Sequence, residues 1–332
     1  MAMLKTPYLL FLGDAHDPLA AKTAAGVAFW RPEWCVGQLR LPRCNADLGI
    51  PDMSVEAAAA AGARTLVVGV ANRGGVVAES WIPILTRALE CGLDLASGLH
   101  RRLTEVPALK SAAERLGRAI ADVRHPSRSF EVGNGKPRSG KRLLTVGTDC
   151  SIGKMFTSLA LEREMHRRGM KADFRATGQT GILIAGDGVS IDAVVADFIS
   201  GATEWLAPAN DGDHWDLIEG QGSLFHASYA GVSLGLLHGA QPTAIVMCHE
   251  PTRTHMRGLP NYPLPTLRDC IDANLRAARL TSPAVACVGV SINTSALDAS
   301  AADSILKQTA DAFGLPCVDP VRTGVGAIVD RL

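Results

Sequence analysis

The chain lacks an excess of charge of either sign and lacks a long apolar run. Lysine plus arginine number 33 and aspartate plus glutamate also number 33, so the formal net charge is zero. Without a net field, we expect neither nucleic acid nor a membrane surface as a partner. No run approaches the roughly 18 apolar residues that span a bilayer. The apolar stretch 8–12 is too short for a signal peptide and ends in a Gly-Asp turn, which favours a buried strand.

Two motifs of common cofactor sites are also missing. No CxxC pair occurs among the eight cysteines, several of which lie in apolar runs where free thiols pack as small hydrophobic groups. This usage predicts a reduced, cytoplasmic enzyme without structural zinc. The sequence GDAHDP after the stretch 8–12 does not contain the GxGxxG fingerprint of dinucleotide-binding domains. We therefore predict no NAD site and no resident metal.

The alternation of strand-like and helix-like segments predicts an α/β protein with two domains. At 332 residues, the chain is about twice the usual length of a domain. Residues 126–140 lose periodicity and are rich in glycine, proline, serine and basic residues, as linkers are. We predict a Rossmann-like N-terminal domain at 1–125, a linker at 126–140 with solvated basic residues, and a P-loop NTPase-like parallel α/β domain at 141–332.

The predicted elements follow from apolar runs and helical periodicity. Strands this apolar are typical of parallel sheets that are buried on both faces. In the first domain, we expect strands at 8–12, 65–70 and 93–96 and helices at 20–29, 55–61, 81–90 and 107–123. In the second domain, we expect strands at 143–146, 171–176, 216–219, 244–248, 284–292 and 316–318 and helices at 153–168, 191–205, 267–279 and 301–313.

The sequence GTDCSIGKM at 147–155 follows an apolar strand and begins a helix. Glycines let the backbone approach an oxyanion, and the amides of such a loop point at it. The helix N-terminus adds partial positive charge, and Lys154 adds a full charge. The segment therefore predicts a site for a phosphorylated cofactor, with contacts from Gly147, Thr148, Asp149, Cys150, Ser151, Gly153, Lys154 and Met155.

This loop departs from the Walker A motif in two ways. Five residues, instead of four, separate its first glycine from the Gly-Lys pair. That spacing resembles the modified P-loop GTDxxxGK of the dethiobiotin synthetase superfamily. Met155 stands where a hydrolysing P-loop carries the Ser or Thr whose hydroxyl binds magnesium, and Thr157 and Ser158 are the alternative hydroxyls. We expect a loop that holds phosphates without cleaving them.

Longer segments carry a second resemblance. EGQGS at 219–223 follows a strand and resembles the EGAGG segment of the same superfamily, in which a glutamate serves magnesium. Together with the P-loop, FRATGQTGILIAGDGVSIDAVVADF at 174–198, EGQGSLFHASYAG at 219–231 and HEPTRTH at 249–255 resemble the DUF1611 family. The resemblance implies a homodimeric N-acetyltransferase that moves acetyl from acetyl-CoA to the amine of an acidic amino acid, D-glutamate. The phosphates of coenzyme A suit a passive anchoring loop.

Acyl transfer to an amine needs a base for the amine proton and donors for the thioester oxyanion. His249 and Glu219 fall at the carboxyl ends of strands, where α/β sheets place their ligands. We predict both as catalytic candidates, and His249 is the natural base near neutral pH. Two alternatives stay open, since His249 could only cap its strand and Glu219 could bind metal or be structural.

Polar residues in loops are the predicted substrate contacts. Paired arginines suit the two carboxylates of a glutamate. Arg253 and Arg257 lie in a proline-rich loop, 251–265, that is neither helix nor central strand, although a solvated loop would carry arginines too. The predicted substrate-binding residues are Arg73, Arg175, Gln179, Thr180, Gln221, Arg253 and Arg257.

One other mechanism and two other functions remain open at the level of sequence. Cys150 lies in an electropositive loop that we expect to lower its pKa, so an acyl-cysteine is conceivable. An ATP- and magnesium-dependent ligase or kinase would use Lys154 and Glu219 for phosphoryl transfer. A nucleotide sensor would bind phosphates without turnover. Stereochemical preference depends on the shape of the pocket and does not follow from residue types.

Overall fold

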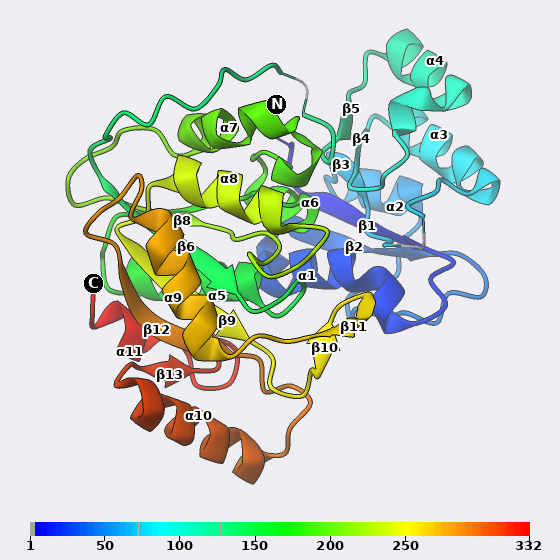
Figure 1. The fold of residues 1–332 in the computed structure, drawn as a ribbon. Helices are drawn as coiled ribbons and strands as arrows, with labels where there is room; N and C mark the ends of the chain where they lie inside the picture. The colour runs from blue at the N-terminus through cyan, green and yellow to red at the C-terminus, as the bar shows by residue number, and fades with distance from the viewer. Residues whose placement is uncertain (1–3, 72–73, 127) are drawn as a thin grey trace. The chain divides into compact units, whose positions relative to one another are not determined.

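The computed structural model describes residues 4–71, 74–126 and 128–332. The chain forms two compact units, and each contains a parallel sheet with packed helices (Figure 1). The first unit comprises Met1–Arg128 and Gly178–Ala193, and the second comprises Ser129–Thr177 and Val194–Leu332. The predicted α/β fold class is confirmed.

The first unit is built on a five-stranded parallel sheet in the order β2-β1-β3-β4-β5. All residues of β1 are buried, because helices cover both faces of a sheet of this kind. Apolar side chains of the strands pack against α2, α3 and α4 around the buried Trp81. Its strands are β1 (Tyr8–Gly13), β2 (Cys35–Arg40), β3 (Thr65–Val68), β4 (Asp94–Ser97) and β5 (Ile120–Asp122), and its helices are α1 (Lys22–Trp30), α2 (Val55–Ala60), α3 (Ile82–Glu90), α4 (Pro107–Leu116) and α6 (Gln179–Ala185).

Several elements of the first unit differ from the predictions. The helix expected at 107–123 ends at Leu116, because Gly117 adopts a left-handed conformation with φ 62° and ends the helix. The residues after it form β5, an edge strand that the sequence did not predict. β2 and α6 were also missed. Helix α6 packs against α1, which places a segment distant in sequence in this unit.

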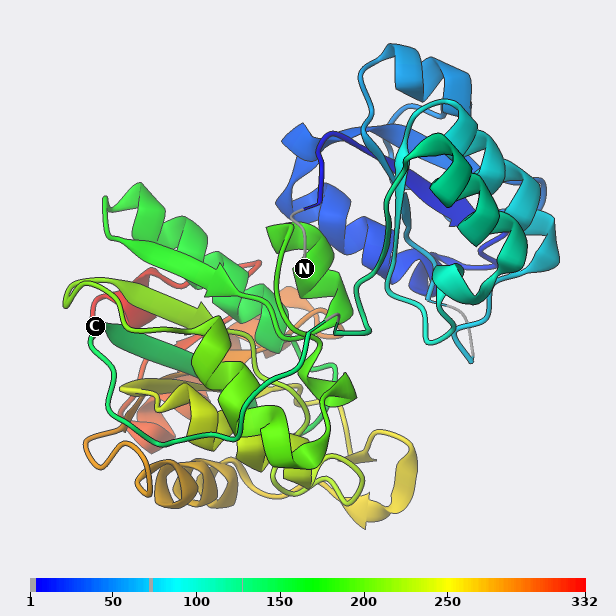
Figure 2. The same cartoon turned by 90° about the horizontal axis from the view of Figure 1, so that it is seen from above.

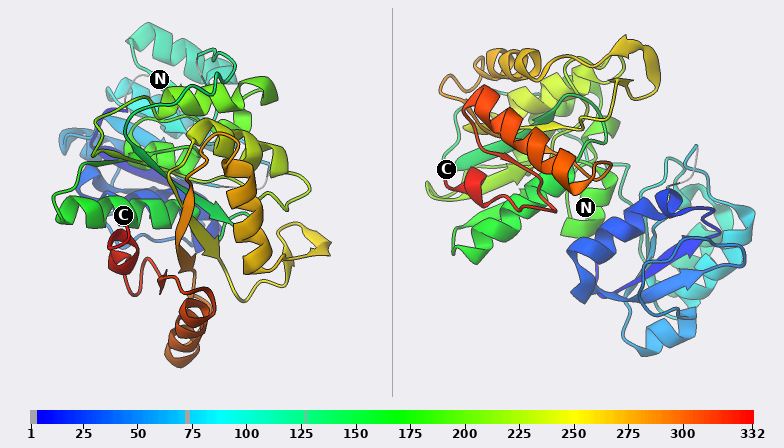
Figure 3. Two further views of the ribbon diagram at one scale, coloured as in Figure 1. Left: turned by 60° about the vertical axis from the view of Figure 1, so that its left-hand side comes forward. Right: turned by 90° about the horizontal axis from the view of Figure 1, so that it is seen from below.

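The second unit contains a six-stranded parallel sheet in the order β13-β12-β9-β6-β8-β7. Helices α8 and α9 lie over one face and α5 lies over the other (Figures 1 and 3). Because the strands are parallel, the carboxyl ends of β6, β8, β9 and β12 share one edge of the sheet. The strands are β6 (Lys141–Gly147), β7 (Ala172–Arg175), β8 (Trp215–Ile218), β9 (Ala244–His249), β12 (Ala286–Ile292) and β13 (Cys317–Val318), and the helices are α5 (Lys154–Arg167), α7 (Ile199–Leu206), α8 (Ala230–Ala240), α9 (Leu267–Ala278), α10 (Ala299–Phe313) and α11 (Gly326–Val329).

The proline-rich loop 251–265 contains a short antiparallel hairpin. Its strands are β10 (His255–Met256) and β11 (Leu259–Pro263), which pair with each other and form a sheet of their own. The hairpin projects from the second unit and is drawn in yellow in Figures 2 and 3. The prediction that this segment is neither helix nor central strand is confirmed.

Helices α7 and α8 pack closely through glycines. The helix expected at 191–205 begins only at Ile199, after two turns of 3-10 helix. A Cβ atom on Gly235 would lie 2.7 Å from Cγ2 of Ile199, and one on Gly239 would lie 2.3 Å from the carbonyl oxygen of Ser200. The sequence analysis missed α8 because glycine disfavours helix, yet here glycine permits the close approach of two helices.

Arg138, in the predicted linker, caps both of these helices. Its Nη1 donates to the carbonyl oxygens of Glu204 at 2.9 Å and Ala207 at 2.7 Å, and its Nη2 donates to the carbonyl oxygens of Gly239 and Ala240. A cation at helix C-termini is favoured by the helix dipole. Burial lowers the pKa of Arg138 to about 10. The expectation that the basic residues of the linker are solvated is therefore wrong for Arg138.

All eight cysteines are free thiols, and burial raises the pKa of Cys248 to about 11. Over residues 4–71, 74–126 and 128–332, we find no helix with both the length and the apolar character needed to cross a bilayer.

Candidate phosphate-binding and catalytic site

Three strand ends of the second unit bring the predicted site residues together. Gly147 ends β6, Glu219 follows β8, and His249 ends β9. Strand β6 lies between β8 and β9 in the sheet, and Gly147 pairs with Cys248, the neighbour of His249. The predicted meeting of these groups at one edge of the sheet therefore follows from the strand order.

The phosphate loop between β6 and α5 depends on left-handed backbone conformations. Gly153, which immediately precedes α5, has φ 108°, and Ser151 has φ 53°. A side chain at Gly147 would place its Cβ 2.6 Å from Cδ1 of Ile152, so the first glycine allows the loop to fold back on itself. The loop leads directly into the N-terminus of α5, a helix end that favours anions.

Lys154 is the buried cation of this loop. Its residue surface is 5% exposed, and its Nζ donates to the carbonyl oxygens of Asp149 at 2.7 Å and Gly222 at 2.9 Å. Among the described residues, no carboxylate oxygen lies within 4.0 Å of this ammonium group. Burial lowers the pKa of Lys154. An anion bound here would supply the missing negative charge and stabilise the protonated lysine.

His249 contacts the phosphate loop through its ring. Nδ1 of His249 lies 3.0 Å from Oγ1 of Thr148, which is buried. Burial is the main cause that lowers the pKa of His249, so the imidazole is neutral at neutral pH. In the tautomer that donates from Nδ1–H to Thr148, Nε2 carries the lone pair and is able to accept a proton.

Glu219 is held by the backbone and side chain of Thr177. The amide of Thr177 donates to Oε2 of Glu219 at 3.0 Å, and Oγ1 of Thr177 donates to the carbonyl oxygen of Glu219 at 2.6 Å. The side-chain amide of Gln221 donates to the same Thr177 hydroxyl at 3.1 Å. Glu219 is 5% exposed, which makes it a buried carboxylate fixed in orientation. Thr177 was not among the predicted site residues, although it lies in the segment RATGQTG.

Asp149 and Arg253 connect the phosphate loop to the segment before the hairpin. Nη1 of Arg253 donates to Oδ2 of Asp149 at 2.7 Å and to the carbonyl oxygen of Cys150 at 2.6 Å. Arg253 also pairs with Glu250, with 2.9 Å between Nη2 and Oε2. The amide of Arg257 donates to Oδ2 of Asp149 at 2.8 Å. The carboxylate of Asp149 is therefore a fully buried anchor for Arg253, which precedes the hairpin, and for Arg257, which lies between its two strands.

The other predicted substrate contacts lie in different surroundings. Arg175 pairs with Asp216 at 2.7 Å and with Asp173 at 3.2 Å. Gln179 and Thr180 belong to α6 in the first unit, where Gln179 packs against Gly98. Arg73 lies outside the described residues. Arg257 is exposed, and its charge opposes the rise in the pKa of Cys150 that burial causes, which places the guanidinium near the phosphate loop.

The expectation that the electropositive loop lowers the pKa of Cys150 is wrong. Burial raises the pKa of Cys150, and this effect outweighs the opposing influence of Lys154, Arg257 and Arg253. A thiol with a raised pKa is a poor nucleophile at neutral pH, so the acyl-cysteine alternative loses its physical basis.

One group of possible metal ligands lies beside the loop. Ligand atoms of Asp149, Cys150 and His226 are within 4.8 Å of one another. However, Asp149 is already paired with Arg253, and Nε2 of His226 contacts the carbonyl oxygen of Arg257 at 3.1 Å. These contacts fit an ion-pair cluster better than a metal site.

Thr157 and Ser158, whose hydroxyls are the alternative magnesium ligands, form hydrogen bonds within the second unit. Oγ1 of Thr157 lies 2.8 Å from Oγ of Ser291 and donates to the carbonyl oxygen of Gly153 at 3.0 Å. Oγ of Ser158 lies 3.1 Å from Oγ1 of Thr145. Both side chains are fully buried, so neither is placed like the hydroxyl that follows the lysine of a hydrolysing P-loop.

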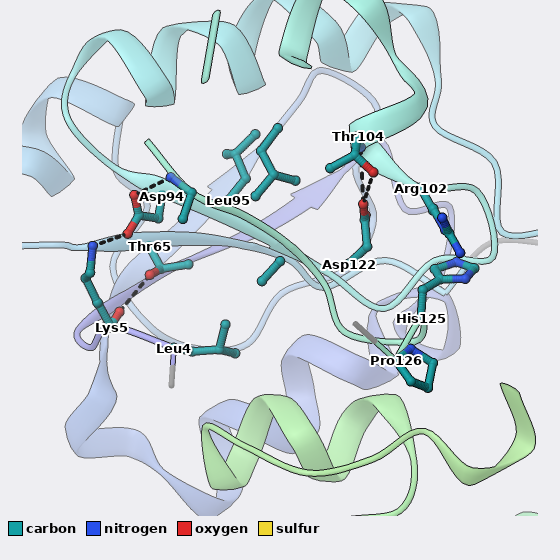
Figure 4. Close-up of a pocket in the computed structure, with 13 residues that line it drawn as sticks. Leu4, Lys5, Thr65, Asp94, Leu95, Arg102, Thr104, Asp122, His125 and Pro126 are labelled. Carbon is teal, nitrogen blue, oxygen red and sulfur yellow. Dashed lines mark hydrogen bonds and ion pairs between the residues drawn. The ribbon is translucent and has the colours of Figure 1, made fainter. Parts of the chain in front are cut away.

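A cavity of about 420 Å³ lies in the first unit, beside β5 (Figure 4). Its charged walls are paired internally: Lys5 binds Asp94 at 2.7 Å, and Thr104 donates to Asp122 at 2.7 Å. None of the predicted site residues that the structure describes lines this cavity. The phosphate loop, and not this cavity, is therefore the candidate functional site.

Comparisons with known proteins agree with this architecture. A DUF1611 model described as "Domain of unknown function (DUF1611_C) P-loop domain" matches residues 131–329, and a DUF1611_N Rossmann-like domain matches residues 41–126. The chain is 56% identical over 330 residues to a D-glutamate N-acetyltransferase from Tritonibacter scottomollicae, with 99% of each chain covered. It is 52% identical over 329 residues to one from Pseudoalteromonas sp, again with 99% of each covered.

A solved structure supports the same assignment over both units. The crystal structure of a DUF1611 family protein from Anabaena variabilis matches with a TM-score of 0.87 and 34% identity, covering 98% of this chain and 99% of that chain. The predicted resemblance is confirmed. The chain belongs to the DUF1611 family.

Proposed function

We propose that this protein is a D-glutamate N-acetyltransferase that uses acetyl-CoA as its acetyl donor. Two relatives that bear the name D-glutamate N-acetyltransferase, at 56% and 52% identity over nearly their whole length, support the reaction. The structural observation that carries the choice of donor is Lys154. A buried ammonium that, within the described part of the chain, is bound by carbonyl oxygens alone, at the end of a glycine loop, suits the phosphates of coenzyme A.

The reaction assigns His249 as the base. The neutral amine of D-glutamate attacks the thioester carbon, so that a C–N bond forms and the C–S bond breaks. The amine proton passes to Nε2 of His249 and then to the departing thiolate of coenzyme A, which leaves as the thiol. Thr148 orients the ring through its 3.0 Å contact with Nδ1.

Glu219 and Arg257 have supporting roles in this proposal. Glu219 is buried and fixed by Thr177, which fits a residue that shapes the site better than one that exchanges protons with solvent. Arg257 is exposed beside the phosphate loop and is our candidate for a carboxylate of the substrate. Binding by Arg175 or Arg253 would require existing ion pairs to break, so we do not assign the substrate to them.

The rival function is an ATP- and magnesium-dependent ligase or kinase. It would need a metal-binding hydroxyl at the start of α5, where Met155 stands. Thr157 and Ser158 are engaged in buried hydrogen bonds. The residues of the chain therefore favour a loop that anchors phosphates over one that cleaves them.

The test measures release of free thiol from acetyl-CoA by the purified protein with D-glutamate, in the presence of EDTA. We expect thiol release that requires D-glutamate and survives EDTA, together with N-acetyl-D-glutamate by mass spectrometry. L-Glutamate and ATP with magnesium serve as the comparison reactions. ATP cleavage without loss of acetyl-CoA would contradict the proposal and support the ligase or kinase.

We further propose, from the family resemblance, that the protein is a cytoplasmic homodimer with domain boundaries near residues 125 and 141. Sedimentation equilibrium tests the oligomeric state. Limited proteolysis tests the linker, since the exposed residues 129 and 131–137 should be cleaved before either sheet.

A further inference from the structure

Tyr229 presents an aromatic ring beside the phosphate loop that the proposed acyl transfer does not use. The ring of Tyr229 packs against the ring of His226 in a tilted arrangement, with 4.5 Å between centroids and 32° between planes. His226 is buried, whereas Tyr229 is 47% exposed. The tyrosine ring thus contacts a buried imidazole on one side, while much of the side chain meets solvent.

Gly222 lies between Tyr229 and the cation of the loop. The carbonyl oxygen of Gly222 accepts a hydrogen bond from Nζ of Lys154 at 2.9 Å. A Cβ atom placed on Gly222 would lie 3.0 Å from Cβ of Tyr229. The tyrosine is therefore in contact with the residue that holds the lysine.

His226 provides a second connection on the other side of the ring. Its Nε2 lies 3.9 Å from Oδ1 of Asp149, the third residue of the phosphate loop. Its Nδ1 accepts a hydrogen bond from the amide of Ser228 at 3.2 Å. Contacts at both ring nitrogens thus hold the imidazole in place. The imidazole in turn supports the ring of Tyr229.

We propose that Tyr229 is the stacking platform for the purine base of the donor, an inference that rests on the proposed function. A coenzyme A molecule held by its phosphates must place its adenine near the phosphate loop. Stacking on an aromatic ring needs no specific hydrogen bonds, because every base offers a π face. A partly exposed tyrosine ring that lies against His226 and next to Gly222, two residues that approach Asp149 and Lys154 of the phosphate loop, supplies such a face.

The test compares a ligand that has the base with one that lacks it. Calorimetry measures the Kd of coenzyme A and of inorganic pyrophosphate for the wild type, Tyr229→Ala, Tyr229→Phe and Leu234→Ala. We expect Tyr229→Ala to raise the Kd of coenzyme A at least about fivefold, since stacking on an aromatic side chain contributes at least that much. The Kd of pyrophosphate should not change.

Two matched variants separate the aromatic ring from exposed apolar surface. Tyr229→Phe keeps the ring and should bind coenzyme A like the wild type. Leu234→Ala removes a 40% exposed apolar side chain from α8 and changes no aromatic residue. It should also leave the Kd of coenzyme A unchanged.

Three results would overturn the inference. The first is an unchanged Kd for coenzyme A in Tyr229→Ala. The second is an equal loss of affinity for coenzyme A and pyrophosphate, which would mean that the ring only shapes the loop. The third is a dimer that becomes a monomer in Tyr229→Ala by sedimentation, which would make the ring a contact between two copies. Binding of coenzyme A without acetyl transfer would refute the proposed function alone, because the comparison of ligands does not depend on turnover.

Discussion

Arg253 and Asp149 form an ion pair across 2.7 Å that joins the segment before the β10–β11 hairpin to the phosphate loop. Asp149 is fully buried, and Arg253 also donates to the carbonyl oxygen of Cys150. The aspartate of the GTD sequence therefore anchors the segment of Arg253, and the arginine holds the backbone of the loop at Cys150. Sequence reasoning assigned the same arginine to the substrate.

Breaking this pair from one side should destabilise the second unit. Arg253→Gln leaves the carboxylate of Asp149 buried without its cation, and we expect a loss of about 2–3 kcal/mol in the free energy of unfolding, below the value for a fully buried pair because Arg253 retains some exposure. Urea denaturation measures it.

The double variant is the control for this prediction. Arg253→Gln combined with Asp149→Asn removes both charges, so it should cost less than the sum of the two single variants. Strict additivity of the three measured values would show that the two side chains do not interact.

His249→Gln should lower kcat by about a hundredfold or more, the usual contribution of a positioned base. The pKa of His249 is lowered by burial, so the neutral base is already formed at pH values below the ordinary histidine range. In the wild type, the rate should rise with pH through this lowered pKa and then level off. This acid limb should be absent in His249→Gln.

Thr148→Val is the companion variant for the base. It keeps the shape of the side chain and removes the hydroxyl that contacts Nδ1 of His249. We expect a smaller decrease in kcat with little change in the KM for acetyl-CoA. A normal pH profile and full activity in His249→Gln would instead direct attention to Glu219.

Binding of coenzyme A should take up protons at alkaline pH. Burial lowers the pKa of Lys154, so part of the free protein carries a neutral lysine at such pH values. Bound phosphates stabilise the ammonium form and raise this pKa, and proton uptake follows by linkage. Calorimetry in buffers of different ionisation enthalpy measures the number of protons.

Lys154→Met is the control for proton uptake. The variant removes the titrating group, so any remaining binding should be independent of the buffer. It should also weaken coenzyme A binding by at least about tenfold, since the lysine supplies a full charge to the loop. Equal proton uptake by the wild type and the variant would remove Lys154 from the binding site.

Gly220→Ala should disrupt the site from within. Its Cβ would lie 1.7 Å from the carbonyl oxygen of Thr145 in β6, so the backbone must shift beside Glu219. We expect a loss of about 1–3 kcal/mol or more in the free energy of unfolding, as for other overpacked sites. Thermal or urea denaturation gives the value.

Gly231→Ala is the matched control in the same unit. Gly231 lies in α8, and a Cβ there meets nothing within 4 Å. Alanine is favoured over glycine in a helix, so this variant should raise the free energy of unfolding by about 0.5–1 kcal/mol. A similar loss in both variants would mean that the clash at Gly220 is relieved elsewhere.

The sequence predicted the elements whose periodicity and length are strong. The apolar strands of both sheets, the P-loop helix α5 and the helices α9 and α10 lie within a few residues of their expected ranges. Helix α8 was missed because its glycines weaken the local helix signal, although they are required by its contact with α7. The edge strand β5 was missed because a short strand gains its stability from pairing with β4, which the local pattern does not contain.

The phosphate loop and the strand-end positions of Glu219 and His249 were determined by the sequence alone. Local spacing is enough to form a glycine loop before a helix, and parallel strands place their carboxyl ends at one edge. Only the tertiary structure decided the partners of the charged groups. Burial raised the pKa of Cys150, and the fold paired Arg253 with Asp149 and gave Lys154 the carbonyl oxygens of Asp149 and Gly222 as partners. Desolvation and pairing depend on residues from distant parts of the chain, and no motif contains them.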